Sequence, residues 1–190
     1  MYKVYDDVVT SDEAEALMIT FKALPFYFLK TENNYSSNAE IQNKWSDKNT
    51  VEAKVMQHEF MQEGEILSKD FGTVEMLLKQ FIGASGENFE GLNRCKLNLQ
   101  FQNKDYDVNK YQCPHKDQDF DHHVLIYYPF TSDGDTIIFK EIANKEYEIV
   151  DRIKPVGGRF LLMSNQFHAS QPPIKNETRM TLNYNLRKHG

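Results

Sequence analysis

Residues 179–186 read Arg-Met-Thr-Leu-Asn-Tyr-Asn-Leu, a stretch in which polar and apolar side chains alternate. Successive side chains of a β-strand point to opposite faces, so this alternation predicts a strand with two unlike faces. The apolar face comprises Met180, Leu182, Tyr184 and Leu186. The polar face comprises Arg179, Thr181, Asn183 and Asn185. One face is therefore expected to pack against a core, while the other is polar and begins with a guanidinium group.

Upstream of this strand, five further short runs are rich in β-branched and aromatic residues and predict strands. They cover residues 95–101, 123–128, 136–139, 147–153 and 160–163. Turn signals separate them at Asp133-Gly134-Asp135 and at Gly157-Gly158. Strands without intervening helices, preceded by a helical half, predict an α+β, mainly β protein. The strands are expected to form a sandwich or barrel, with helices bracing one face.

The amino-terminal half has a different pattern. After a strand-like start at 2–9, residues 10–24 carry apolar side chains at helical spacing, and Thr10 with Glu13 forms a capping box. Further helices are expected over 51–66 and 71–82, the second ending at Gly83, with a loop over 83–91. The polar segment 30–49, which contains Trp45, is expected to be either a mobile surface loop or a substrate lid.

Composition excludes several classes of protein. A chain of 190 residues fits one domain, and a net charge of -6 argues against a broad basic surface for nucleic acid or anionic lipid. No apolar run reaches the ~18 residues of a membrane span, and the amino terminus is too polar for a signal peptide. A cytoplasmic location is therefore expected. The two cysteines, Cys95 and Cys113, do not indicate a disulfide framework.

Candidate metal ligands occur in two places. His115 and Asp117 are two residues apart, so in extended backbone both side chains point to the same side, although an accidental surface pair has the same spacing. His168 follows the apolar run 158–163 and could also be a core histidine. Asp119 shares the side of the first pair if the backbone stays extended, and His122 and His123 add further potential ligands.

Arg179 is the candidate anion-binding residue. An arginine on an inward-facing strand position needs an anionic partner to offset its desolvation. That partner could be a ligand carboxylate gripped by the planar guanidinium, or an internal Asp or Glu. Two histidines and one carboxylate together would form the facial triad of non-haem iron(II) oxygenases, which leaves coordination positions for a co-substrate and dioxygen.

The order of these elements resembles a known family. His115-x-Asp117 is followed by an Ile126-Tyr127-Tyr128 strand, a Gly-Asp-Thr turn at 134–136, a Gly-Arg-rich apolar strand, His168 and then Arg179. This order is similar to that of the prolyl 4-hydroxylase-type 2-oxoglutarate/Fe(II)-dependent dioxygenases. The resemblance covers roughly residues 94–186, half of the chain.

The resemblance implies a double-stranded β-helix, or jelly roll, braced by N-terminal helices. It implies a single oxygenase domain over 1–190, with helical support at about 10–82 and the jelly-roll core at about 94–187. His115, Asp117 and His168 would be the metal ligands and catalytic centre. Arg179 and Tyr128 would bind the distal carboxylate of 2-oxoglutarate, and Tyr128 could instead be plain core. Thr181 and Asn183 would complete the pocket floor, with Asn98 and Tyr111 as weaker candidates for its wall.

The implied cofactors are Fe(II), 2-oxoglutarate as co-substrate and O2, with ascorbate as a further candidate. The expected reaction hydroxylates a small-molecule or peptide substrate and releases succinate and CO2, with a peptidyl prolyl or other amino-acid side chain slightly favoured. Fold analogy is a poor guide to substrate, and a nucleobase substrate is the less favoured option. Two rival interpretations stay open. One is a non-catalytic jelly-roll protein that binds a metal or small carboxylate; the other is a cupin-like enzyme that recruits His122 or His123.

Overall fold

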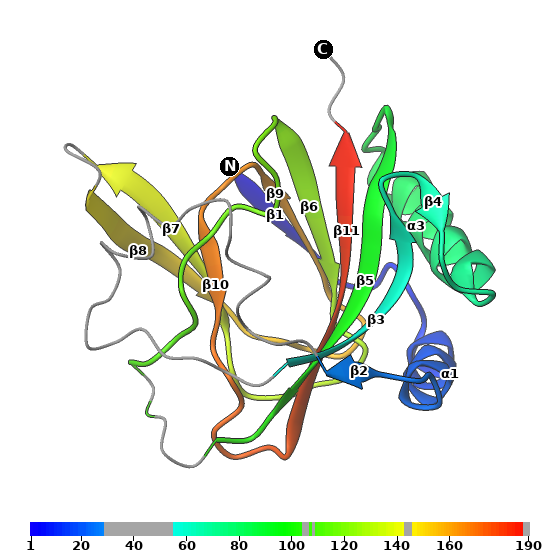
Figure 1. Cartoon of the computed structure of the whole chain (residues 1–190), viewed down its shortest axis with the longest axis horizontal. Coiled ribbons are helices and arrows are strands. Elements are labelled where there is room, and N and C mark those ends of the chain that lie inside the picture. Colours follow the sequence, from blue (N-terminus) through cyan, green and yellow to red (C-terminus); the bar gives the residue numbers. More distant parts are fainter. Residues whose placement is uncertain (29–54, 104–106, 108, 143–145, 188–190) are drawn as a thin grey trace.

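The computed structural model describes residues 1–28, 55–103, 107, 109–142 and 146–187, and these form two antiparallel sheets and two helices (Figure 1). The larger sheet runs in the order β1 (Tyr2–Tyr5), β9 (Phe160–Ser164), β6 (His122–Tyr127), β11 (Thr178–Arg187), β5 (Gly91–Phe101), β3 (Val55–Gln62) and β2 (Tyr27–Phe28), with β4 (Glu65–Ile66) paired to β3. The smaller sheet runs β10 (His168–Ser170), β7 (Thr136–Ile142) and β8 (Glu146–Ile153). Two facing sheets of this kind are the jelly-roll architecture that the sequence predicted.

The helices are α1 (Ser11–Lys22) and α3 (Phe71–Ser85). The expected capping box at the start of α1 is confirmed: the Glu13 N–H donates to the Thr10 hydroxyl, and the Thr10 N–H donates to the Glu13 carboxylate at 2.7 Å. Helix α3 runs past Gly83, where it was expected to end. It stops instead at Gly86, whose φ of 71° is the left-handed conformation that glycine adopts without strain.

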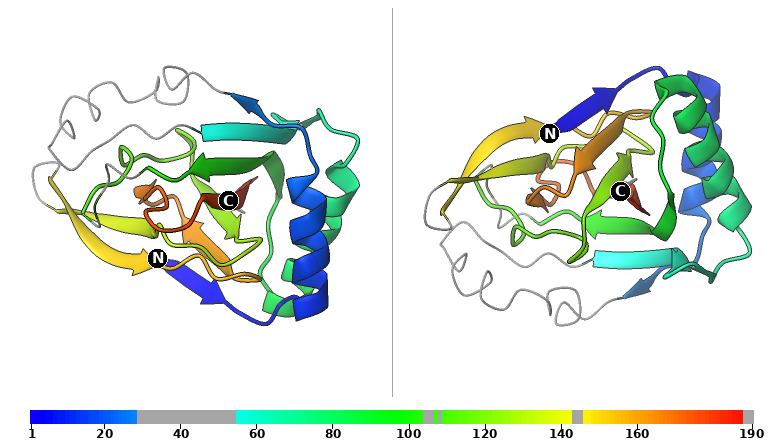
Figure 2. Two further views of the ribbon diagram at one scale, coloured as in Figure 1. Left: turned by 90° about the horizontal axis from the view of Figure 1, so that it is seen from below. Right: turned by 90° about the horizontal axis from the view of Figure 1, so that it is seen from above.

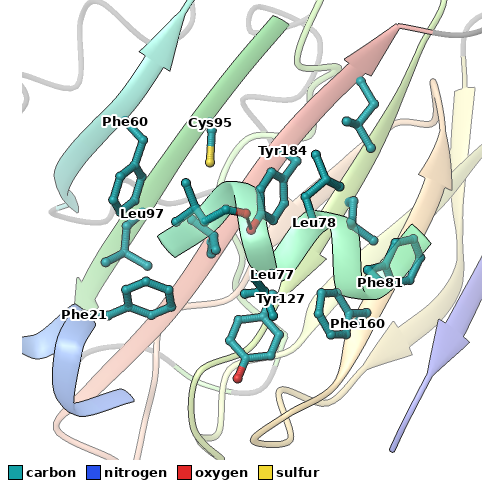
Figure 3. Close-up of a cluster of buried hydrophobic side chains, with 14 of the residues drawn as sticks. Phe21, Phe60, Leu77, Leu78, Phe81, Cys95, Leu97, Tyr127, Phe160 and Tyr184 are labelled. Atoms are coloured by element: carbon teal, nitrogen blue, oxygen red, sulfur yellow. Dashed lines mark hydrogen bonds between the residues drawn. The ribbon is translucent and has the colours of Figure 1, made fainter. Parts of the chain in front are cut away.

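Both helices pack against one face of the larger sheet, and the smaller sheet lies on its other side (Figures 1 and 2). The main apolar core fills the space between helices and sheet, as Figure 3 shows. Its largest fully buried members are Phe21, Phe60, Phe81, Leu97, Leu125, Tyr127, Phe160 and Tyr184. The helices therefore leave the opposite face of the sheet available to other groups.

The predicted helix over 51–66 is wrong within the described residues. Strands β3 and β4 occupy 55–66, and β3 pairs with β5 from Val55 to Gln62. Burial along β3 partly follows the two-residue period of a strand, since Glu59 is exposed between buried His58 and Phe60. Backbone pairing with a long neighbouring strand outweighs the helical propensity of this stretch.

Other boundaries also differ from expectation. The loop expected over 83–91 is shortened by the last turn of α3, and the long strand β5 already begins at Gly91. Strand β10 was not anticipated. Trp45 and the proposed lid over 30–49 lie outside the described residues. No helix within the described ranges has the length and apolar character needed to cross a membrane.

Candidate active site

His115 and His168 lie on neighbouring backbone segments that pair with each other. The His115 N–H donates to the His168 carbonyl oxygen at 2.9 Å, and the His168 N–H donates to the His115 carbonyl oxygen at 3.0 Å. Directly opposed residues in an antiparallel pair project to the same side. The two imidazole rings consequently lie with their centroids 4.8 Å apart, although 53 positions separate them in the sequence (168 minus 115).

Asp117 completes a three-residue cluster. One ligand atom from each of His115, Asp117 and His168 lies within 4.8 Å of the other two. The imidazole Nδ1 atoms contact backbone carbonyl oxygens, of Cys113 for His115 and of Gln166 for His168, both at 3.1 Å. Because a carbonyl oxygen only accepts, each Nδ1 carries the proton and each Nε2 presents its lone pair, as a metal-binding histidine requires.

The protonation states of this cluster suit a cation. Burial, together with the positive field of His115, lowers the pKa of His168 to about 4, so its ring is neutral at physiological pH. Burial alone would raise the pKa of Asp117. Its contacts with His115 and the charge of Arg94 outweigh that effect and hold the pKa well below its usual range. The imidazole nitrogens of His115 and His168 and one carboxylate make up the donor set of a mononuclear iron(II) centre.

The Asp117 carboxylate is held from behind by two residues of the larger sheet. Asn185 Nδ2 donates to Asp117 Oδ2 at 2.9 Å, and Arg94 Nη2 lies 3.4 Å from Asp117 Oδ1. Arg94 Nε also donates to Asn185 Oδ1 at 2.9 Å, so the three side chains form one network. Such outer partners fix the orientation of a metal ligand.

Arg179 is 3% exposed and has only neutral partners in the described part of the chain. Its Nε donates to the Gly134 carbonyl at 2.6 Å, Nη1 to Gln100 Oε1 at 2.8 Å and Nη2 to Thr136 Oγ1 at 2.7 Å. No described carboxylate lies within 4.0 Å, so the internal salt bridge considered from the sequence is not present among these residues. Each Nη also carries a second N–H, which gives the guanidinium two further donors for an anion.

Tyr128 lies against Arg179 in this corner of the site. It is fully buried, its hydroxyl donates to Thr136 Oγ1 at 2.7 Å, and the guanidinium carbon lies 5.9 Å from the centre of its ring. Burial raises the pKa of Tyr128, which keeps the phenol neutral. Val124 and Ile126 share its apolar cluster, as the alternation along this segment predicted.

A cavity of about 130 Å³ joins these groups. His115, Asp117, His168 and Arg179 all line it, together with Thr181, Asn183 and Asn98. Tyr111 packs instead against Phe139, in a separate small apolar cluster. Drug-sized pockets measure ~300–1,000 Å³, so this space suits a small molecule.

The other potential ligands lie apart from the cluster. Asp119 is exposed, and among the described residues neither it nor Asp121 joins a metal-binding group. His123 is half-buried and contacts Ser164 and the ring of Phe89. His122 begins β6 and is buried, with Nδ1 2.7 Å from the Phe120 carbonyl oxygen.

The sequence pattern missed several residues that surround the site. Gln100 and Thr136 bind Arg179, and Gln100 Nε2 also donates to Ser170 Oγ at 2.8 Å, which ties the arginine to the strand of His168. Arg94 and Lys96 line the cavity from β5. A signal was available for this strand: Arg94, Lys96, Asn98 and Gln100 alternate with Cys95, Leu97 and Leu99, as on β11.

The sequence matches no protein-family model and no curated protein. The structure, in contrast, is similar to an oxidoreductase of the 2OG-Fe(II) oxygenase family from Burkholderia pseudomallei, with a TM-score of 0.66 and 11% identity over 99% of this chain and 86% of that one. It is also similar to a Pseudomonas putida prolyl-4-hydroxylase, with a TM-score of 0.54 and 12% identity over 99% and 92% of the two chains.

A third similar structure is a prolyl hydroxylase from Trichoplax adhaerens in complex with a hypoxia inducible factor oxygen degradation domain peptide fragment. Its TM-score is 0.57, with 13% identity over 98% of this chain and 83% of that one. At such identities these likenesses show the fold. The chain thus has the jelly-roll fold of the 2OG-Fe(II) oxygenases, and the predicted fold class is confirmed.

Proposed function

We propose that the chain is a non-haem Fe(II)/2-oxoglutarate-dependent dioxygenase that hydroxylates its substrate and releases succinate and CO2. The observation that carries this proposal is the proximity of the His115, Asp117 and His168 ligand atoms, within 4.8 Å of one another, in a cavity that also contains Arg179. A jelly-roll fold common to 2OG-Fe(II) oxygenases supports the same reading.

The donor set fits iron(II). Two Nε2 atoms and one carboxylate would occupy one side of the ion and leave positions for 2-oxoglutarate and dioxygen. When bound, the iron and 2-oxoglutarate supply the oxidising power: one oxygen atom of O2 enters the substrate C–H bond as a hydroxyl group, and the other enters succinate. The Nδ1–H groups of His115 and His168 donate to backbone carbonyl oxygens, which leaves each Nε2 lone pair for the metal.

Arg179 would hold the distal carboxylate of 2-oxoglutarate. Its side chain is fixed by Gly134, Gln100 and Thr136, so little conformational entropy is lost when an anion binds. Tyr128 does not line the cavity itself, and it supports this end by donating a hydrogen bond from its hydroxyl to Thr136 Oγ1, which does. Thr181 and Asn183 border the same space from β11. The protein thereby positions the co-substrate and limits the access of water to it.

The substrate class is the finer part of the proposal. Fold similarity by itself favours a peptidyl prolyl or other amino-acid side chain, because prolyl hydroxylases are among the similar structures and one of them is in complex with a peptide. A free amino acid or related small molecule would use the same chemistry. The cavity of about 130 Å³ next to the three ligands suits either a projecting side chain or a small molecule.

An anaerobic titration tests this function. Fe(II) and then 2-oxoglutarate are added to metal-free protein, the weak visible charge-transfer band of the chelate is recorded, and succinate is assayed after oxygen is admitted. The unaltered protein is expected to show the band and a slow, uncoupled release of succinate. Arg179→Ala is expected to need a much higher 2-oxoglutarate concentration for the same band, because the variant lacks the bidentate cation.

Arg159→Ala is the matched control, because this arginine pairs with Asp6 at 2.8 Å outside the cavity. Its titration should match that of the unaltered protein. A folded protein that binds Fe(II) but produces neither band nor succinate would establish the rival interpretation, a jelly-roll protein that binds a metal without oxidising anything.

A further inference from the structure

The cavity is strongly cationic in a chain that is acidic overall. Among the described residues its lining includes Arg94, Lys96, Lys116 and Arg179 and a single carboxylate, that of Asp117, whereas the whole chain has a formal charge of -6. Cationic side chains gathered in a concave site raise the local concentration of anions. The positive charge is therefore specific to the cavity and does not follow from the charge of the whole chain.

The proposed cofactors do not neutralise this charge. Fe(II) is a dication and 2-oxoglutarate a dianion, so the pair adds no net charge. Asp117 would be engaged by the metal and Arg179 by 2-oxoglutarate. Lys96 is then left without an anionic partner among the described residues and the cofactors, and Arg94 has only the carboxylate of Asp117, which it would share with the metal. Lys116 differs from them, because its ammonium lies over the ring of Phe167, 5.0 Å from the centre.

Lys96 is the more informative of the two. It is 9% exposed, yet no described carboxylate lies within 4.0 Å of its ammonium nitrogen. Burial and the neighbouring charge of Arg94 lower the pKa of Lys96 to about 8, while Asp117 and Glu59 oppose that shift from a greater distance. A buried cation without a close partner destabilises the ligand-free protein, and an anionic ligand removes this penalty.

The pairing of β5 with β11 sets the order of these groups. Arg94 lies opposite Asn185, Lys96 opposite Asn183, Asn98 opposite Thr181 and Gln100 opposite Arg179. This polar ladder, defined by these four pairs, begins at the Asp117 contact and ends at the proposed 2-oxoglutarate anchor. Lys96 and Gln100 are four residues apart, or about 13 Å along an extended strand. The cations at the two ends of this spacing are Lys96 and Arg179, which lies opposite Gln100. Their separation along the strands allows each to bind a different anion.

Polar atoms near Lys96 also lack partners. Asn183 is mostly buried, and its Oδ1 has no hydrogen-bond partner in the described part of the chain; the same holds for Asn98 Oδ1. Both side chains line the cavity: Asn183 lies opposite Lys96, and Asn98 lies in the next row of the polar ladder. Buried amide groups are normally hydrogen-bonded, so their unused capacity next to an unpaired ammonium indicates a polar ligand.

We propose that Arg94 and Lys96 bind a carboxylate of the substrate, so that the substrate is a small organic acid, such as a free amino acid, held by its acidic group beside the metal. This inference rests on the proposed function for the identity of the reaction, but the anion site itself does not require oxidation. The guanidinium and ammonium would grip the carboxylate, while the side-chain amides of Asn98 and Asn183 would hydrogen-bond polar groups next to it.

Binding of a simple probe tests the site without a known substrate. Protein loaded with Co(II) and saturating 2-oxoglutarate is titrated with acetate, and with acetamide as the neutral counterpart, in a calorimeter. Acetate is expected to bind saturably and acetamide is not. Lys96→Met should weaken acetate binding at least ~10-fold, because a charged hydrogen bond is lost. Lys96→Arg should retain it, and Lys79→Gln, at a surface position on α3, should not change it.

Arg94→Gln is the second variant. Because Arg94 contacts the Asp117 carboxylate, its acetate binding is measured only in samples shown to contain metal. Acetate binding that is equal in the unaltered, Lys96→Met and Arg94→Gln proteins would overturn the proposal. So would the absence of saturable binding. Acetate binding that depends on Lys96 in a protein with no charge-transfer band and no succinate would retain the anion site and refute only the oxygenase function.

Turnover identifies the acid. Each free L-amino acid and its carboxamide are compared for their ability to accelerate succinate release above the uncoupled rate. Acceleration by a free acid and not by its amide supports the proposal. Equal acceleration by both, or acceleration by a neutral proline-containing peptide in the Lys96→Met variant as well, would show that the acidic group is not recognised. If no amino acid accelerates release, the acetate titration alone decides the existence of the site.

Discussion

The two faces of the β5–β11 strand pair come from the same residues in alternation but have opposite characters. Toward α1 and α3, side chains such as Leu97, Leu182 and Tyr184 are fully buried in the main core, and the Tyr184 hydroxyl donates to the Val74 carbonyl at 2.8 Å. Toward the smaller sheet, the same strands present Lys96, Asn183 and the rest of the polar ladder. A side-chain period of two residues separates these faces completely.

This difference assigns stability to one face and chemistry to the other. Apolar side chains on the helix side contribute about 1.5–3 kcal/mol each on burial. Arg94, Lys96 and Arg179 on the cavity side are desolvated, and they depend on hydrogen bonds or on a ligand for compensation. Substitutions on the helix side should therefore lower stability and leave ligand binding unchanged, whereas substitutions on the cavity side should change ligand binding without lowering stability.

The largest effect is expected at the metal ligands. His168→Ala removes one of the three proposed protein donors, so Fe(II) or Co(II) should show no binding at concentrations that saturate the unaltered protein. Folding should be nearly unaffected, because His168 lies outside the main core. Metal binding by calorimetry, alongside a circular dichroism melt, gives both quantities. His123→Ala is the control, and metal loss in that variant but not in His168→Ala would overturn the ligand assignment.

Leu182→Ala should lower the stability of the protein and leave its metal affinity unchanged. Leu182 is fully buried in the helix-side core, and truncation of such a leucine costs about 3–5 kcal/mol through lost transfer energy and a residual cavity. Denaturant unfolding of the metal-free protein measures the cost. Under conditions where the variant remains folded, its affinity for metal should match that of the unaltered protein. A change in affinity comparable to that of a ligand replacement would show that the two faces are coupled.

Lys96→Met should stabilise the ligand-free protein below pH 8. The folded-state pKa of Lys96, about 8, lies below the ordinary lysine value of 10.5, because burial and the charge of Arg94 disfavour its charged form. A shift of this size corresponds to about 3 kcal/mol, which is an upper value for the stabilisation. The same substitution should weaken acetate binding, so a stability increase and a binding loss would occur in one variant.

The sign of the pH dependence follows from proton linkage. Between pH 8 and 10.5 the unfolded chain binds more protons at Lys96 than the folded protein does, so the stability of the unaltered protein rises with pH in this window. Lys96→Met lacks that rise. The stability difference between the two proteins should hence be largest below pH 8 and shrink toward pH 10.5. A difference that is constant across the window would show that the folded-state pKa of Lys96 is close to its ordinary value, as for a well-solvated ammonium.

Local patterns predicted much of this molecule. The capping residues Thr10 and Glu13 define the start of α1, and the alternation along β11 assigns its two faces correctly. Such features depend on neighbours within a few residues, which the sequence contains directly. The helix expected over 51–66 failed for the opposite reason, since β3 exists because β5 lies beside it.

In the candidate site, too, the features set by nearby residues were predicted and those set by distant segments were not. The spacing of His115 and Asp117 could be read locally, and the distance from His168 to Arg179 matched a family pattern. The backbone bridge between His115 and His168, and the Arg94–Asn185–Asp117 network, depend on pairings between distant segments. A single sequence contains no signal for such pairings. Asn185 was assigned to the polar face correctly, but its partner Asp117 could only be found in three dimensions.

The smallest effect on metal affinity is expected at Asn185, which donates a hydrogen bond to Asp117. Replacing Asn185 with Ala removes the hydrogen bond to Asp117 Oδ2 and the acceptor of Arg94 Nε, but it keeps all three proposed metal ligands and the Arg94 guanidinium beside Asp117. Loss of an outer partner of a ligand usually lowers metal affinity ~10–100-fold, and the lower end is expected here because Arg94 still faces the carboxylate. Co(II) titration measures the change, with Asn176→Ala as a control on the distant Asp133 turn. Asn185→Asp is a sharper test, because aspartate is nearly the same size as asparagine but places a second carboxylate beside Asp117. If the Asn185 amide donates to Asp117, this variant should weaken metal binding more than Asn185→Ala does. If Asn185 only fills space, it should weaken binding no more than Asn185→Ala.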